Sequence, residues 1–250
     1  MLKNNPGFRD FYFVFMDIEK IYKKLLLHFG PQGWWPIFDK KSQQCSYFTT
    51  IGSRKSDSGK KQFEICIGAI LTQNTAWKNV EKALCNLSRA ECLSPEKILK
   101  CHKLEELIRP AGYYNQKAKK LRIFSEWWKK NSPSLSKEGL REVDLLTTLR
   151  LKLLNLWGIG PETADSMLLY AFKKPIFVVD AYTKRLCREC GVEFNTYDQY
   201  CQFFESQFPK SVRLDSEPKR AKFFNEYHAL IVAWGKLYGK NKKAALELLK

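Results

Sequence analysis

The sequence has no apolar run long enough to cross a membrane. Its longest apolar stretch near the start, Phe11 to Met16, lies between Asp10 and Asp17. A signal-peptide core needs about 7–15 apolar residues and a membrane-spanning helix about 20, so we expect neither here. The eight cysteines are scattered along the chain, and without a secretion signal they are expected to be reduced thiols rather than a disulfide framework.

Acidic residues are scarce as well. The 26 Asp and Glu are outnumbered by 43 Lys and Arg, which gives a formal net charge of +17. Because 44% of the residues are hydrophobic and 14% are aromatic, the chain can bury a core, which excludes a disordered, fibrous or mucin-like protein. A folded chain with this basic excess favours a polyanionic partner, either nucleic acid or an anionic membrane surface. A basic surface that only improves solubility is the alternative.

Strand patterns are nearly missing. The only strand-like run is Ile176 to Val179, whereas apolar residues recur at helical spacing elsewhere, as in Phe63, Ile67 and Ile70. We therefore predict an all-α fold of about ten short helices. Residues 39–62 depart from this pattern because they are polar, basic and rich in Ser and Gly, which predicts a loop insertion. That loop could contact a nucleic-acid backbone or be a plain surface insertion.

A glycine turn joins two of the predicted helices. In the run from Gly158 through Ile159 to Gly160, the glycines permit a tight turn with positive φ and a close approach of the backbone to a ligand. Pro161 then suits the first turn of a helix, whose free N–H groups and dipole favour phosphate. Such a site reads no base, so its natural target is the DNA backbone. An ordinary helical corner would use the same residues.

The residues around this turn resemble the helix-hairpin-helix and Gly/Pro-Asp signature of the endonuclease III superfamily of DNA glycosylases. Leu156 to Gly160 and Lys174 to Asp180 carry that signature, and Leu71 to Thr75 is similar to the segment that this family inserts into DNA. Three further stretches look like the 3-methyladenine DNA glycosylase III branch, also called endonuclease III-related proteins: residues 33–36, 109–119 and 227–232.

The resemblance implies a two-lobed helix-hairpin-helix DNA glycosylase fold with a DNA groove between the lobes. Residues 63–174 are expected to form a six-helix barrel domain that ends in the hairpin. Residues 1–38 and 175–250 would form a second, discontinuous helical domain, with 39–62 as the basic insertion.

The resemblance also implies DNA contacts. A glycosylase must rotate the damaged nucleotide out of the duplex to reach its glycosidic bond. Gln73 is expected to fill the gap that the base leaves, although a polar residue at a helix break would look the same. The hairpin residues Gly158, Ile159, Gly160 and Thr163 are expected to bind the DNA backbone. Basic residues flank these motifs, at Lys173 and Lys174 and at Lys184, Arg185 and Arg188, and a further cluster at Lys117, Lys119 and Lys120 lies in the barrel.

Asp180 is the predicted catalytic carboxylate. A fixed negative charge would stabilise the positive charge that develops on the sugar, and the same group could orient the attacking water. Asp180 also directly precedes a predicted helix, where aspartate is a good N-cap, and the two roles are compatible. Glu162 stands where family members that also cut the strand carry a Schiff-base lysine, so we expect a monofunctional enzyme without lyase activity.

Aromatic residues indicate the substrate. Trp34, Trp35, Pro36 and Trp77 occupy positions that form the base pocket in the similar 3-methyladenine enzymes, and Lys236 resembles a pocket lysine. Electron-rich rings favour a positively charged base by about 0.5–2 kcal/mol per contact, and 3-alkyladenine in DNA is such a base. The tryptophans could instead be core residues, and Lys236 a solvated one.

No metal or other cofactor is expected. Many superfamily members hold an iron–sulfur cluster with four closely spaced cysteines near the C-terminus. Here Cys187, Cys190 and Cys201 are followed by no further cysteine, so the sequence departs from that pattern.

The sequence therefore predicts a monofunctional DNA glycosylase of base excision repair that removes an alkylated purine of the 3-methyladenine type. Its partner would be double-stranded DNA with a damaged base; we expect a monomer with no membrane partner, cytoplasmic, and associated with the nucleoid if the source is prokaryotic. The alternatives are a different lesion (uracil, a mispaired or an oxidised base) and a non-catalytic helix-hairpin-helix DNA-binding protein. A pure binder would need neither Asp180, Gln73 nor the tryptophans.

Overall fold

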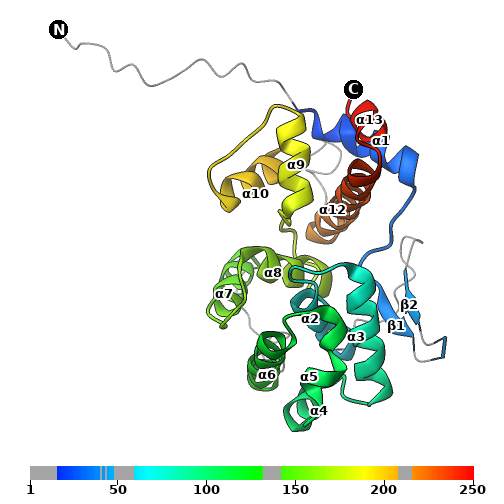
Figure 1. Cartoon of the computed structure of the whole chain (residues 1–250). Coiled ribbons are helices and arrows are strands. Elements are labelled where there is room, and N and C mark those ends of the chain that lie inside the picture. The colour runs from blue at the N-terminus through cyan, green and yellow to red at the C-terminus, as the bar shows by residue number, and fades with distance from the viewer. Residues whose placement is uncertain (1–15, 40, 43, 48–58, 132–141, 208–215) are drawn as a thin grey trace.

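The structure is a computed structural model that describes residues 16–39, 41–42, 44–47, 59–131, 142–207 and 216–250. Helices dominate these residues and are arranged in two lobes, which confirms the predicted fold class (Figure 1). Within the described ranges, no helix has the length and apolar character that crossing a bilayer requires.

One lobe is built around α2, in which every residue from Ile65 to Leu71 is buried. A helix that is apolar all round belongs at the centre of a lobe, and α2 contacts α3, α6 and α8. A π-helical stretch, Met167–Ala171, continues α8 and also packs on α2. The helices of this lobe are α2 (Gly59–Leu71), α3 (Trp77–Arg89), α4 (Pro95–Lys100), α5 (Leu104–Leu107), α6 (Tyr114–Asn131), α7 (Glu142–Leu154) and α8 (Pro161–Ser166).

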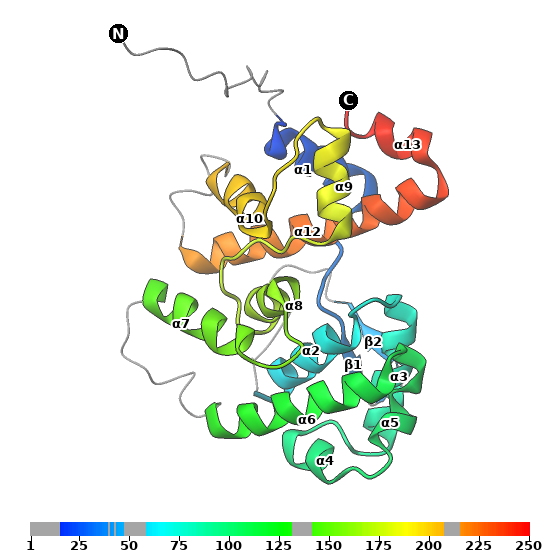
Figure 2. The ribbon, with the colours of Figure 1, turned by 60° about the vertical axis from the view of Figure 1, so that its left-hand side comes forward.

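The other lobe combines the first described helix with the last ones. Its long helix, α12, contacts α1, α9 and α13, and it reaches the π-helical stretch of the first lobe (Figure 2). The chain therefore leaves this lobe after α1 and returns to it before α9. The helices are α1 (Ile18–Phe29), α9 (Ala181–Glu189), α10 (Tyr197–Ser206), α12 (Glu217–Lys240) and α13 (Lys242–Glu247). The domain boundaries given above stay a prediction.

A small hairpin is the main departure from the prediction. Strands β1 (Ile37–Asp39) and β2 (Gln44–Ser46) pair antiparallel, with Ile37 opposite Ser46, and pack on α2 and α3. The interpretation of 39–62 as one loop is therefore wrong for β2 and for residues 59–62, which begin α2. Residues 48–58 lie outside the described part. Strands of three residues are too short to show an alternating pattern.

The strand-like run Ile176 to Val179 forms no strand. It is an extended, buried segment that links the two lobes, and side chains of the second lobe accept two of its backbone N–H groups. The N–H of Phe177 donates to Glu205 (2.8 Å), and the N–H of Val179 donates to the Tyr197 hydroxyl (3.3 Å). Its apolar residues are explained by this burial rather than by a sheet.

Candidate active site and DNA interface

A cavity of about 620 Å³ lies between the two lobes, with walls from α2, α3 and α8 on one side and α9 and α12 on the other. It brings together most of the predicted site residues: Trp34, Trp35, Gln73, Trp77, Thr163, Asp180 and Lys236. Pro36 is buried and does not line the cavity, and Gly158, Ile159 and Gly160 lie outside it.

Asp180 is the N-cap residue of α9 and lines this cavity. Its Oδ1 accepts the N–H of Thr183 (2.7 Å), so the predicted N-cap is confirmed. Its Oδ2 lies 3.6 Å from Nε2 of His228 on α12. Burial acts to raise the pKa of Asp180, but His228 and the Thr183 amide outweigh it and lower the pKa below its ordinary value. The cap and the histidine thus hold an ionised carboxylate at the cavity wall.

His228 and Tyr170 support this carboxylate from behind. His228 is 8% exposed, and the hydroxyl of the buried Tyr170 hydrogen-bonds its Nδ1, so the ring is fixed between Tyr170 and Asp180. Tyr170 projects from the π-helical stretch, a widened turn of the kind that is frequent at functional sites. The sequence motifs predict no role for either residue. The only signal in the sequence is a histidine within the apolar run of residues 227–232.

Aromatic rings form another part of the cavity wall. The ring centroid of Trp77 lies 5.0 Å from that of Trp34 and 5.1 Å from that of Trp35. Trp35 is only 5% exposed and also packs on Gly68, so it belongs to the core and to the cavity at once. The Nζ of Lys236 lies 5.7 Å from the centroid of Trp34, and burial lowers the pKa of this lysine.

Glu162 lies at the rim of the same cavity, where the residue is partly open to solvent while its carboxyl group is largely buried. Burial of its carboxyl group, together with the negative charge of Asp180, raises the pKa of Glu162. The first turn of α8 therefore brings a second carboxylate, and no amine, to the place where the resemblance puts a nucleophilic lysine in strand-cutting enzymes.

Gln73 follows α2 and rests against the glycine turn. Its amide nitrogen donates to the carbonyl of Gly158 (3.1 Å) and to Oγ1 of Thr163 (2.9 Å), and Lys120 donates to its Oε1. Gly158 has a φ of +80°, as the predicted tight turn requires.

The side chain of Ile159 in this turn is buried, and so is that of Thr163, whereas both glycines are exposed. The surface that could meet a DNA backbone therefore consists of the glycine backbone and the N–H groups that begin α8.

Comparison with known proteins agrees with this geometry. The model of the HhH-GPD superfamily of base excision DNA repair proteins matches residues 67–210, more than half of the chain. The chain belongs to this superfamily. The match includes the glycine turn and Asp180, the two parts of the signature that the superfamily name abbreviates.

Two similar proteins extend beyond the HhH-GPD segment. A protein of Methanocaldococcus jannaschii, provisionally named a DNA repair glycosylase, is 40% identical over 232 residues and 91% of each chain. The H. pylori 3-methyladenine DNA glycosylase MagIII, solved with bound 1,N6-ethenoadenine, is 30% identical, with a TM-score of 0.64 over 90% of this chain and 98% of that one.

A trapped endonuclease III–DNA covalent intermediate shares the HhH-GPD fold. It is 17% identical, with a TM-score of 0.58 over 89% of this chain and 84% of that chain. At this identity the likeness supports the two-lobed fold alone.

Cys187, Cys190 and Cys201, the cysteines considered for a cluster, are free thiols in the structure. Cys187 is buried, and the Cys201 thiol donates to the carbonyl of Phe177 (3.2 Å). Among the residues that the structure describes, no group of three or more His, Cys, Asp or Glu side chains could hold a metal ion. That this HhH-GPD protein carries no cluster stays a prediction.

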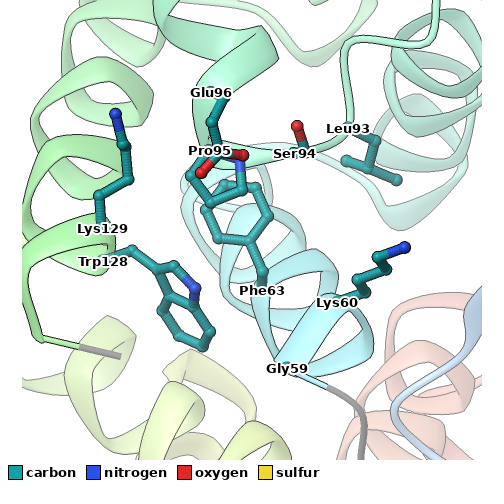
Figure 3. A pocket seen from close by; sticks show the side chains of 9 residues that line it. All are labelled: Gly59, Lys60, Phe63, Leu93, Ser94, Pro95, Glu96, Trp128 and Lys129. Atoms are coloured by element: carbon teal, nitrogen blue, oxygen red, sulfur yellow. The ribbon is translucent and has the colours of Figure 1, made fainter. Parts of the chain in front are cut away.

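A smaller cavity of about 260 Å³ lies in the first lobe, away from this site. The rings of Phe63 and Trp128 form part of its lining, and Lys60 and Lys129 stand beside it (Figure 3). None of the predicted site residues lines it, so it does not contribute to the HhH-GPD site.

Proposed function

We propose that this protein is a monofunctional DNA glycosylase that flips an alkylated purine of the 3-methyladenine type out of duplex DNA and releases it by hydrolysis. The observation that carries the proposal is that an ionised carboxylate, Asp180, and a wall of tryptophan rings face one cavity. The similarity to MagIII supports the choice of lesion. A protein that only bound DNA would have no use for either feature.

The hairpin and Gln73 would prepare the nucleotide for the cavity. The backbone of Gly158 and Gly160 would bind phosphates beside the lesion. Gln73 lines the cavity, so its amide is placed to enter the space that the flipped base leaves in the stack. To do so, Gln73 must exchange its bonds to Gly158, Thr163 and Lys120 for bonds to the orphaned base.

Asp180 would then stabilise the breaking of the glycosidic bond. The bonding electrons leave with the base, which neutralises a cationic alkylpurine and leaves positive charge on the sugar. The carboxylate stabilises that charge, and water adds to the anomeric carbon and loses a proton. His228 and Thr183 keep Asp180 ionised and oriented for this step.

Replacing Asp180 by asparagine tests the core of the proposal. The side-chain oxygen of asparagine could still accept the Thr183 N–H, so the fold should survive while the negative charge is lost. We expect the wild type to release 3-methyladenine from methylated duplex DNA, and the Asp180→Asn variant to do so at least about 100-fold more slowly. Circular dichroism verifies the fold, and chromatography identifies the released bases. Equal release by both proteins would remove Asp180 from the mechanism.

Borohydride trapping tests the absence of lyase activity. Because Glu162 cannot form a Schiff base, borohydride added during turnover should give no covalent protein–DNA adduct. Endonuclease III, run in parallel on its own substrate, provides the positive control. An adduct on the wild-type chain would show that some lysine acts as a nucleophile, and the protein would not be monofunctional.

A further inference from the structure

The cavity between the lobes is lined by more carboxylates than ammonium groups, although the protein as a whole is basic. The whole chain has a formal charge of +17, yet three carboxylates line the cavity, from Glu81, Glu162 and Asp180, against the ammonium groups of Lys78 and Lys236. Asp180 and Glu162 lie where the sugar would react. Glu81 lies apart from them, on the aromatic wall, and the mechanism proposed above does not use it.

Glu81 is fixed to this wall by two hydrogen bonds. It lies one turn after Trp77 on α3, and its Oε1 accepts the indole N–H of Trp77 (2.9 Å) and the hydroxyl of Tyr47 (3.2 Å). Tyr47 directly follows β2, so the hairpin that the sequence did not reveal supplies the second donor. Both hydrogen bonds use Oε1, and the other carboxylate oxygen, Oε2, takes part in neither of them.

This arrangement makes one side of the aromatic wall attractive to a cation. The carboxylate adds a fixed negative charge beside Trp77, and an indole whose N–H donates to a carboxylate is more electron-rich at its face. The positive charge of Lys236 lies at Trp34 and not at Trp77, with its Nζ 5.7 Å from the centroid of the Trp34 ring. The negative charge of Glu81 acts to raise the pKa of Lys236, against the larger effect of burial, so the two groups are electrostatically linked.

We propose that Glu81 determines the specificity of this pocket for positively charged, N-alkylated purines over neutral bases of the same shape. The inference rests on the proposed function, because it concerns the base that enters that cavity. A neutral base would pack equally well against the rings but would gain nothing from the carboxylate, whereas a cation gains both the Coulomb attraction and the stronger contact with Trp77.

Two isosteric ligands and one variant test this role. 3,9-Dimethyladeninium is a cation near neutral pH, and 3,9-dimethyl-3-deazaadenine has its shape without the charge when the buffer pH lies above the pKa of its ring nitrogen. Their dissociation constants are measured by quenching of tryptophan fluorescence. The Glu81→Gln variant keeps an oxygen that accepts from Trp77 and Tyr47 but loses the charge. We expect the wild type to prefer the cation about tenfold, and the variant to bind both ligands within about twofold of each other.

A matched control and the release assay separate the possible outcomes. Glu126→Gln removes the same charge from an exposed position on α6 that does not line the cavity, and it should keep the wild-type preference. The inference is overturned if wild type fails to bind the cation, if it shows no preference, if Glu81→Gln keeps the preference, or if Glu126→Gln loses it. Failure of the proposed function is a different result, namely no release of 3-methyladenine from methylated DNA by the wild type.

Discussion

Asp180 performs two tasks with one carboxyl group. As the N-cap of α9 it accepts the Thr183 N–H, and it also presents negative charge to the cavity. The tasks support each other, since the hydrogen bonds that fix the side chain also favour its ionised form. The helix cap is therefore compatible with the catalytic role that we propose for Asp180.

Glu205 is a residue whose charge should make stability depend on pH. It accepts the N–H of Phe177 from the segment that links the lobes, and burial raises its pKa from an ordinary value of 4.5 to about 7. Its folded form therefore binds the proton more tightly than its unfolded form, so the free energy of unfolding should fall as the pH rises from about 4.5 to 7.

The Glu205→Gln variant should lack this contribution. Its amide oxygen can still accept from Phe177, but it has no proton to lose. Between about pH 4.5 and 8, we expect the wild type to lose about 2 kcal/mol more unfolding free energy than the variant, as measured by urea denaturation. Glu193→Gln, at an exposed position, should behave as the wild type does. Identical pH profiles for wild type and Glu205→Gln would show that Glu205 is not titrating in this range.

Residues that act alone could be predicted from the sequence more readily than residues that act through a partner. Asp180 and Trp77 stand in local motifs, and the structure places both at the cavity. His228 and Glu81 depend on tertiary contacts. Tyr170, which hydrogen-bonds His228, is 58 residues away from it in the chain, and Tyr47 is 34 residues from Glu81. No pattern within a short window contains that information.

At the scale of elements, the turn between α7 and α8 uses its two glycines differently. Gly158 has a positive φ, and a Cβ there would clash with the side chain of Lys120. Gly160 has a φ of −93°, and no atom lies within 4 Å of the place where its Cβ would be. Gly158 is therefore required by the fold, and Gly160 leaves open space on the surface that we expect to meet DNA.

Alanine at each position separates these requirements. Gly158→Ala should lower the free energy of unfolding by about 1–2 kcal/mol, through backbone strain and displacement of Lys120. Gly160→Ala should change stability by less than about 0.5 kcal/mol but still weaken DNA binding, because the added methyl group blocks close approach of a phosphate. Denaturation and titration of duplex DNA measure the two effects. Unchanged DNA affinity in Gly160→Ala would argue against contact at this turn.

Elements with strong helical periodicity were predicted correctly, and the errors have physical causes. One such helix is α4, where Ser94 is the N-cap and its Oγ accepts the N–H of Lys97 (3.3 Å). The β1–β2 hairpin was missed because its strands have three residues each. Ile176 to Val179 is no error, because the all-α prediction assigned it to no sheet; it resembles a strand because burial between two lobes demands the same apolar residues as burial in a sheet.

At the scale of the whole molecule, the basic residues do not all serve the same purpose. Lys117 belongs to a basic cluster in the sequence, yet it is 1% exposed and donates to the carbonyls of Leu71 (2.9 Å) and Ala111 (2.7 Å). Burial, with a contribution from Lys120, lowers its pKa to about 8. The net charge therefore overstates the number of cations that can contact DNA. Whether a cation contributes to DNA binding depends on its position in the fold.

Lys184 and Arg188 are placed where they can contact DNA phosphates, because both are exposed on α9, the helix that follows Asp180. Each phosphate contact releases counterions, so the logarithm of DNA affinity should fall steeply with the logarithm of salt concentration. Replacing both residues by glutamine should reduce that slope by about 1.8, at about 0.9 per contact, without changing the rate of base release from bound DNA.

Lys129→Gln with Lys130→Gln removes the same charge at the far end of α6 and should leave the slope unchanged. If both pairs reduced the slope equally, net charge rather than a defined face would bind DNA, and the placement of the duplex beside α9 would be wrong.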